Sequence, residues 1–122
     1  MLIKMNSYQK GLFAEFLAEL LLRIKFYKIL ERRYKTKCGE IDIIAQRGNL
    51  LLFVEVKRRS TEMEAKEAIT QKNRQRIEKT ALLFLSKHSK CANMDVRYDV
   101  IWFSGKGLWP KHQKDAWRTG VF

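Results

Sequence analysis

The sequence predicts an α/β fold in which helices and a sheet form packed layers. Two runs rich in Ile, Leu, Val and Phe, residues 41–46 and 50–57, have the composition of strands. Helical patterns of apolar residues occupy 8–25 and 71–87, one before and one after these runs. With one further strand before the two runs and one after the second helix, the element order is helix, three strands, helix, strand. That order is typical of a layered α/β sandwich.

The composition fits one domain, residues 1–122, with 46% hydrophobic residues and no need for a metal or disulfide to stabilise its core. Lys and Arg number 25 against 13 Asp and Glu, so the formal net charge is +12. Solubility asks for a charge of only about 2–8. The excess indicates a polyanionic partner, with nucleic acid the first choice and an anionic membrane surface the second.

The first helix is expected from Tyr8 to Lys25, with Ser7 as its N-cap, after a flexible start at residues 1–7. It is apolar nearly all round, which is typical of a helix buried between the sheet and another layer or between two subunits. Five charged residues interrupt the apolar run from 12 to 30, too many for a membrane span. The broad face consists of Leu12, Phe13, Phe16, Leu17, Leu20, Leu21 and Ile24, and the other side of Ala14, Ala18 and Leu22.

The two central strands are expected to form a hairpin with Gly48-Asn49 as a two-residue turn. This turn pairs Arg47 with Leu50 and, further out, Asp42 with Glu55, whereas a three-residue turn would shift the register. Alternation of side chains then places Asp42, Glu55 and Lys57 on one face, with Glu40 opposite Lys57.

Carboxylates that face each other across a sheet destabilise it unless a cation compensates them. Mg²⁺ takes one or two carboxylates together with water and phosphate oxygens, so Asp42 and Glu55 are candidate ligands. The alternative is a ladder of salt bridges on a solvated sheet face, which is common on exposed strands.

The spacing of Asp42 and the Glu55-Val56-Lys57 triplet resembles the D…(D/E)-x-K signature of the PD-(D/E)xK nuclease superfamily. The segments GEIDIIA (39–45) and FVEVKRRS (53–60) resemble the YraN-like family of small predicted endonuclease-fold proteins, which are related to archaeal Holliday-junction resolvases. The similarity extends from about Gly11 to Phe103. It implies a restriction-endonuclease-like αβββαβ core with a central mixed sheet flanked by helices.

The first helix of that family carries a G-x-x-G-E-x-x-A pattern, which this chain matches from Gly11 to Ala18 with Ala14 in place of the second glycine. The resemblance implies that Glu15 projects towards the metal site as an extra carboxylate. On the helix alone, Glu15 is a polar residue away from the main apolar face. Glu19 is a plausible partner for Arg23 at i,i+4.

The resemblance implies a Mg²⁺- or Mn²⁺-dependent endonuclease acting on structured or branched DNA, with DNA favoured over RNA. Asp42, Glu55 and the carbonyl of Val56 would hold the metal. Lys57 would orient or deprotonate the attacking water or stabilise the transition state. One alternative is a nucleic-acid-binding protein that keeps the fold without cutting. Another is an assembly protein whose basic face binds ribosomal RNA or a membrane.

Basic residues outside the signature are candidates for phosphate contact, and the alternative for each is a solvated surface. Four lie in a turn after the first strand, two follow the signature lysine, and two lie at the start of a helix from Gln71 to Lys87 that Thr70 is expected to cap. Residues 61–69 between them are expected to be a loop or a short helical turn. The candidates are Arg32, Arg33, Lys35, Lys37, Arg58, Arg59, Lys72 and Arg74.

The last strand is expected from Val96 to Phe103, with Asp99 in a structural role, pairing with Arg97 or a helix donor. A C-terminal extension, 104–122, either covers a sheet edge or contacts nucleic acid. His88 and His112 lack ligand spacing. Two distant cysteines, Cys38 and Cys91, fit a reducing cytoplasm. We expect no membrane partner, and the apolar first helix permits a homodimer.

Overall fold

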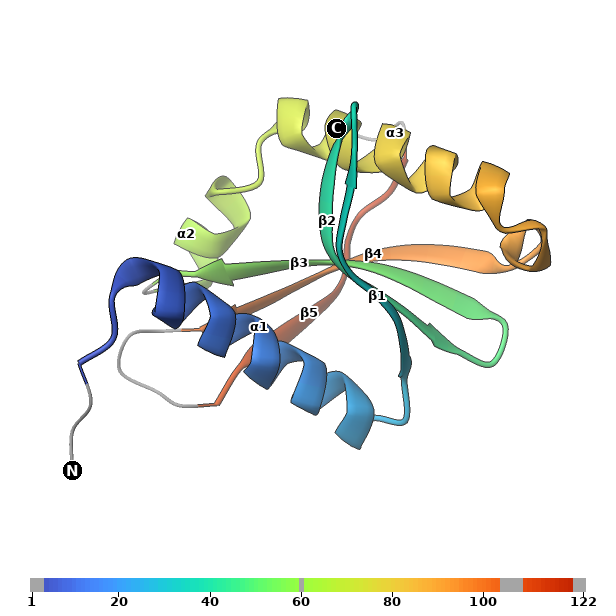
Figure 1. The fold of residues 1–122 in the computed structure, drawn as a ribbon. Helices are drawn as coiled ribbons and strands as arrows, with labels where there is room; N and C mark the ends of the chain where they lie inside the picture. Colours follow the sequence, from blue (N-terminus) through green and yellow to red (C-terminus); the bar gives the residue numbers. More distant parts are fainter. Residues whose placement is uncertain (1–3, 60, 104–108, 120–122) are drawn as a thin grey trace.

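A computed structural model describes residues 4–59, 61–103 and 109–119, without the side chain of Glu62. Figure 1 shows one sheet with helices on both faces. The residues outside the described part are Ser60, 1–3, 104–108 and 120–122. They include part of the flexible start and part of the C-terminal extension expected from the sequence. The elements are α1 (Ser7–Ile24), β1 (Lys28–Thr36), β2 (Gly39–Arg47), β3 (Leu50–Arg58), α2 (Glu62–Glu67), α3 (Gln71–Lys87), a 3₁₀ turn (Ser89–Cys91), β4 (Asp95–Phe103) and β5 (Lys111–Trp117).

The sheet is mixed, with the strand order β1-β2-β3-β4-β5. All neighbouring pairs are antiparallel except β3 and β4, which run parallel and are joined through α2 and α3. The predicted α/β class and the mixed sheet flanked by helices are therefore confirmed, and they are consistent with a restriction-endonuclease-like core. The C-terminal segment adds β5 along β4, so of the two roles considered for it, it covers the sheet edge.

The helix boundaries follow local capping. Helix α3 begins at Gln71 after Thr70, whose hydroxyl accepts a hydrogen bond from the Asn73 N–H, as predicted. For α1 the prediction of Ser7 as N-cap is wrong. Asn6 caps the helix, because Asn6 and Gln9 each accept a hydrogen bond from the other's backbone N–H.

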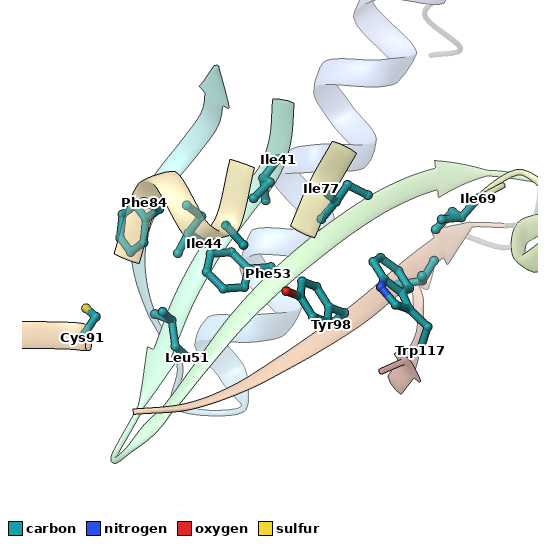
Figure 2. Close-up of a cluster of buried hydrophobic side chains, with 12 residues drawn as sticks. Ile41, Ile44, Leu51, Phe53, Ile69, Ile77, Phe84, Cys91, Tyr98 and Trp117 are labelled. Carbon is teal, nitrogen blue, oxygen red and sulfur yellow. The ribbon is translucent and has the colours of Figure 1, made fainter. Parts of the chain in front are cut away.

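Each face of the sheet has its own core. Between the sheet and α3, Ile44 and Phe53 pack against Phe84, and Tyr98 stacks on Trp117 of β5 at a centroid distance of 5.0 Å (Figure 2). Between the sheet and α1, a second cluster joins the small residues of α1 to alternate side chains of the same strands. It contains Ala14, Ala18, Leu21, Leu22, Tyr27, Ile43, Ala45, Leu52, Val54, Ile101 and Phe103.

Within the described chain helix α1 is packed on one side only, so of the two arrangements expected for it, no further layer of these residues covers its other side. Its small-residue side lies on the sheet, because Ala14 and Ala18 let the helix backbone approach the strands closely. Most of the broad apolar face points away, with Phe16 59% exposed and Ile24 54% exposed. Among the described residues, no helix has the length and apolar character that crossing a membrane requires.

Candidate active site

The β2–β3 hairpin has the predicted register at its closed end. Arg47 pairs with Leu50, and the ladder continues to Ile43 and Val54. Gly48 in the turn has a φ of 59°, a left-handed conformation that glycine adopts without strain.

The hairpin opens at Asp42, and the predicted backbone pairing of Asp42 with Glu55 is not formed. Ile41 and Ile44 both face α3 although they are three residues apart, so the alternation of faces is interrupted between them. Instead, Oδ2 of Asp42 accepts a hydrogen bond of 2.8 Å from the Val56 N–H. The Asp42 side chain therefore ties the two strands together where their backbones separate.

Beside this opening lies a cleft of about 470 Å³. The three predicted metal ligands, Asp42, Glu55 and Val56, line it together with Lys57. Glu15 of α1 lines it from one side and Arg76 of α3 from the other. The four residues predicted to be catalytic are thus brought together in one place. The lining is Gly11, Ala14, Glu15, Gly39, Glu40, Asp42, Glu55, Val56, Lys57, Arg58, Arg59, Asn73, Arg76 and Ile77.

Glu55 has an unsatisfied carboxylate. The residue is 8% exposed, and its Oε1 is one of three buried side-chain polar atoms without a hydrogen-bond partner among the described residues. Burial, followed by the charge of Asp42, raises the pKa of Glu55 well above its usual value, and Lys57 opposes this in part. Burial also raises the pKa of Asp42 to about 6, despite the hydrogen bond from Val56. For both acids the loss of hydration outweighs the favourable charge of Lys57, so their ionised forms are incompletely stabilised.

These residues fit a hard divalent cation. Among the described residues, no three Asp, Glu, His or Cys side chains gather into a ready metal cluster, so the protein offers a pair of carboxylates. Mg²⁺ characteristically binds through one or two carboxylates and completes its shell with water and substrate phosphates. An orphaned, buried carboxylate oxygen beside a second carboxylate is a donor set of that kind.

Glu15 is held by an arginine that the sequence did not reveal as its partner. Nε and Nη2 of Arg33 both donate to Oε2 of Glu15, at 2.9 and 2.7 Å. One turn further along α1, Glu19 pairs with Arg32 and, as predicted, with Arg23. Arg32 and Arg33, expected to contact nucleic acid, thus bind carboxylates of α1 in a small pocket next to the cleft.

The other basic residues predicted to contact nucleic acid lie partly in the cleft and partly away from it. Arg58 and Arg59 line the cleft, and Lys35, Lys37 and Lys72 are exposed away from its lining. Arg74 lies over the ring of Trp117, 5.5 Å from its centroid.

Arg76 and Asn73 were missed as cleft residues. The helical period contained the signal, because residues 73, 76 and 77 share a face that excludes 74. Gly39 permits this close approach of α3: a Cβ at Gly39 would lie 3.2 Å from Oγ1 of Thr80 and 3.3 Å from Cβ of Arg76.

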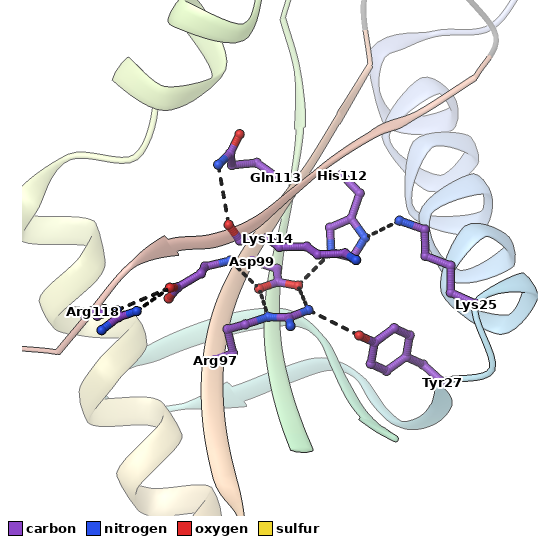
Figure 3. Close-up of polar contacts among 9 residues, drawn as sticks. Lys25, Tyr27, Arg97, Asp99, His112, Gln113, Lys114 and Arg118 are labelled. Carbon is purple, nitrogen blue, oxygen red and sulfur yellow. Dashed lines mark hydrogen bonds and ion pairs between the residues drawn. The ribbon is translucent and has the colours of Figure 1, made fainter. Parts of the chain in front are cut away.

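On the α1 side of the sheet, Asp99 forms the centre of a buried polar network (Figure 3). Arg97 donates to both carboxylate oxygens at 2.8 Å, as predicted, and Nε2 of His112 donates to Oδ2 at 2.6 Å. The Asp115 N–H donates to Oδ1, and Nζ of Lys25 contacts Nδ1 of His112 at 2.9 Å. Burial alone raises the pKa of Asp99, but the hydrogen bonds from His112 and Arg97 outweigh it and keep that pKa below its usual value.

The amino-acid sequence is similar to a described protein family and to individual proteins of that family. A profile described as "Uncharacterised protein family UPF0102" matches residues 14–103, which include the whole hairpin. The chain is 48% identical over 113 residues to a UPF0102 protein of Bartonella tribocorum, covering 89% of this chain and 83% of that one. It is 43% identical over 112 residues to a UPF0102 protein of Parvibaculum lavamentivorans, with coverage of 92% and 84%.

Proposed function

The chain belongs to the UPF0102 family, also called the YraN family, and from this membership and the geometry of the cleft we propose that it is a divalent-metal-dependent nuclease. Its substrate in this proposal is structured or branched DNA, and its reaction is hydrolysis of a phosphodiester bond. The observation that carries the proposal is the orphaned Oε1 of Glu55, buried beside Asp42 in an open cleft.

The carboxylates and the lysine of the cleft have distinct roles in this reaction. Asp42, Glu55 and the carbonyl of Val56 would hold Mg²⁺ or Mn²⁺, and the Val56 N–H fixes the orientation of Asp42. When bound, such an ion lowers the pKa of a water and polarises a phosphoryl oxygen. Lys57 orients the attacking water and balances the charge that grows on the phosphate.

The cationic rim serves to bind the substrate backbone. Arg58, Arg59 and Arg76 line the cleft and offer guanidinium groups that bind phosphate in bidentate fashion. Such contacts recognise shape and charge rather than base sequence, in keeping with the net charge of +12. The free thiols of Cys38 and Cys91 favour a cytoplasmic location, where reducing conditions preserve them.

A second function, binding nucleic acid without cutting it, is favoured by one specific observation. Glu15 is engaged by Arg33, so two carboxylates rather than three remain for a cation. A protein of this kind would keep the charge and the fold but not the reaction.

Cleavage assays separate the two functions. We expect Mg²⁺- or Mn²⁺-stimulated cutting of branched or flapped DNA in preference to linear duplex, single-stranded DNA and RNA. Glu55→Gln should lower the cleavage rate at least about 100-fold, since it removes a metal ligand. The matched control is Glu31→Gln, which changes an exposed carboxylate outside the cleft and should cut normally. Tight, salt-sensitive binding with no metal-stimulated cutting of any substrate would establish the non-catalytic function instead.

A further inference from the structure

Helix α1 carries an uncovered apolar face. Large side chains along it are exposed by 37% to 59%, whereas the opposite side of the same helix is buried on the sheet. The five positions recur at helical spacing and so lie on one side of the helix. We call them the α1 face: Leu12, Phe13, Phe16, Leu20 and Ile24.

The size of this face is that of a protein interface. Tyr8 and Phe26 extend it at its two ends, with exposures of 68% and 87%. With about 150–250 Å² for each large side chain, the five residues of the α1 face expose about 350–600 Å², and Tyr8 and Phe26 bring the total to on the order of 800 Å². Monomers rarely expose a contiguous apolar patch above about 300–600 Å², and a stable complex buries about 800 Å² on each partner.

The ion pairs beside the α1 face favour a partner whose contacting surface is uncharged. The acidic residues of the helix, Glu15 and Glu19, are already neutralised by Arg33 and by Arg32 and Arg23. Covering the face therefore leaves no unpaired acid. A helix that lies on an anionic membrane instead has a polar side rich in free Lys and Arg. In α1 the side opposite the α1 face is apolar and packs on the sheet, and Arg23 is paired with Glu19.

From these observations we propose that the α1 face binds the α1 face of a second copy of this chain, forming a two-fold symmetric dimer. The ridge of Leu12, Phe16, Leu20 and Ile24 has the i,i+4 spacing that packs into the grooves of an identical helix. A two-fold axis near the middle of the helix brings Phe16 and Leu20 of both copies to the centre of the interface, where apolar anchors contribute most.

The dimer has a consequence for the cleft, and this consequence alone rests on the proposed function. The N-terminal half of α1 contributes Gly11, Ala14 and Glu15 to the cleft from its other side. Pairing through α1 would therefore hold two clefts in a fixed relation, suited to a substrate with two strands to be cut.

The test is the molar mass of the full-length chain in solution, measured by light scattering over a range of concentrations. We expect a mass approaching twice 14.5 kDa. The dimer should persist at about 0.5 M salt. Salt does not weaken an apolar contact, and it screens the repulsion between the two cationic copies. Leu20→Glu and Phe16→Glu should each weaken dimerisation at least 100-fold. Both positions are exposed in the single chain, so folding, checked by circular dichroism, should be kept.

Leu82→Glu is the matched control, since Leu82 is an exposed leucine on α3, away from the α1 face. It should leave the mass unchanged. A wild-type chain that is monomeric at every concentration would overturn the proposal, as would a dimer that survives both α1 substitutions. Binding of the monomer to phosphatidylserine vesicles through Phe16 and Leu20 would overturn it in favour of a membrane. None of these readouts depends on nuclease activity, so the two proposals can fail separately.

Discussion

Two of the buried acidic residues, Asp99 and Glu55, lie in different regions and differ in how their carboxylates are satisfied. Asp99 is fully buried and accepts four hydrogen bonds, from Arg97, His112 and the Asp115 backbone. Glu55 is nearly as buried, yet one of its oxygens has no partner among the described residues. The same burial therefore accompanies a pKa below the usual value for Asp99 and above it for Glu55.

The difference separates a structural acid from a candidate functional one. A buried charge is stable where hydrogen bonds and opposite charges replace the lost water, as around Asp99. Where they do not, the protein bears the cost of desolvation, and it does so mainly where a ligand completes the site. The Asp99 network is closed by β5 and the end of α1, whereas Glu55 opens on a cleft.

The largest effect is expected from Asp99→Ala. It leaves Arg97 and His112 without their buried partner, and such losses cost about 3–5 kcal/mol of unfolding free energy. Urea denaturation measures this. Asp95→Ala, at the exposed start of the same strand, should cost less than about 0.5 kcal/mol. A similarly small cost for Asp99→Ala would mean that the network does not hold β5.

The metal-free protein should lose stability as the pH rises through the pKa of Asp42. That pKa, about 6, lies above the ordinary 3.8, so the folded state favours the protonated acid. Its stabilising contribution is complete below about pH 4 and lost by about pH 7, amounting to up to about 3 kcal/mol. Asp42→Asn should therefore become more stable than wild type as the pH rises over this range. Denaturation at several pH values, with EDTA, checks this, and a difference that does not change with pH would refute it.

Asp99 has the opposite sign of pH dependence. Its lowered pKa contributes stability that is present above about pH 4 and lost as the pH falls further.

Adding Mg²⁺ or Mn²⁺ should raise the melting temperature of wild type, and EDTA should reverse the rise. Binding at about 100 times the dissociation constant corresponds to about 2.7 kcal/mol of stabilisation. Glu55→Gln should remove the response without lowering metal-free stability, because a neutral amide replaces a desolvated acid. Asp99→Asn, if folded, should keep the response. Equal responses from wild type and Glu55→Gln would place the metal elsewhere.

The smallest effect concerns the ion pair beside the cleft. Arg33→Gln should raise the affinity for Mn²⁺ several-fold, about 1 kcal/mol, because it frees Glu15 next to Asp42. Arg32→Gln removes the same charge one residue away but affects only Glu19, which stays paired with Arg23 and does not line the cleft. Calorimetric titration of both variants distinguishes release of Glu15 from simple loss of a cation. Equal affinities would show that Glu15 takes no part in the metal site.

Much of the fold followed from local signals. The turn at Gly48-Asn49 set the hairpin register, and Thr70 marked the start of α3. The strand β5 was not expected, because Lys111–Trp117 is largely polar and its pairing with β4 is decided by the sheet edge. His112 likewise lacked any local pattern, since its partners Asp99 and Lys25 are distant in the sequence.

The order of residues was enough to bring two acids and a lysine near one end of a hairpin, because turn geometry acts over a few residues. It did not reveal that strand alternation is interrupted at Asp42, which leaves Asp42 and Glu55 unpaired. It could not decide which side of α1 meets the sheet, since both sides are apolar, nor that Arg33 holds Glu15. Those outcomes depend on how closely whole elements approach one another. Only the folded chain brings Ala14 and Ala18 against the strands and leaves Phe16 and Leu20 exposed.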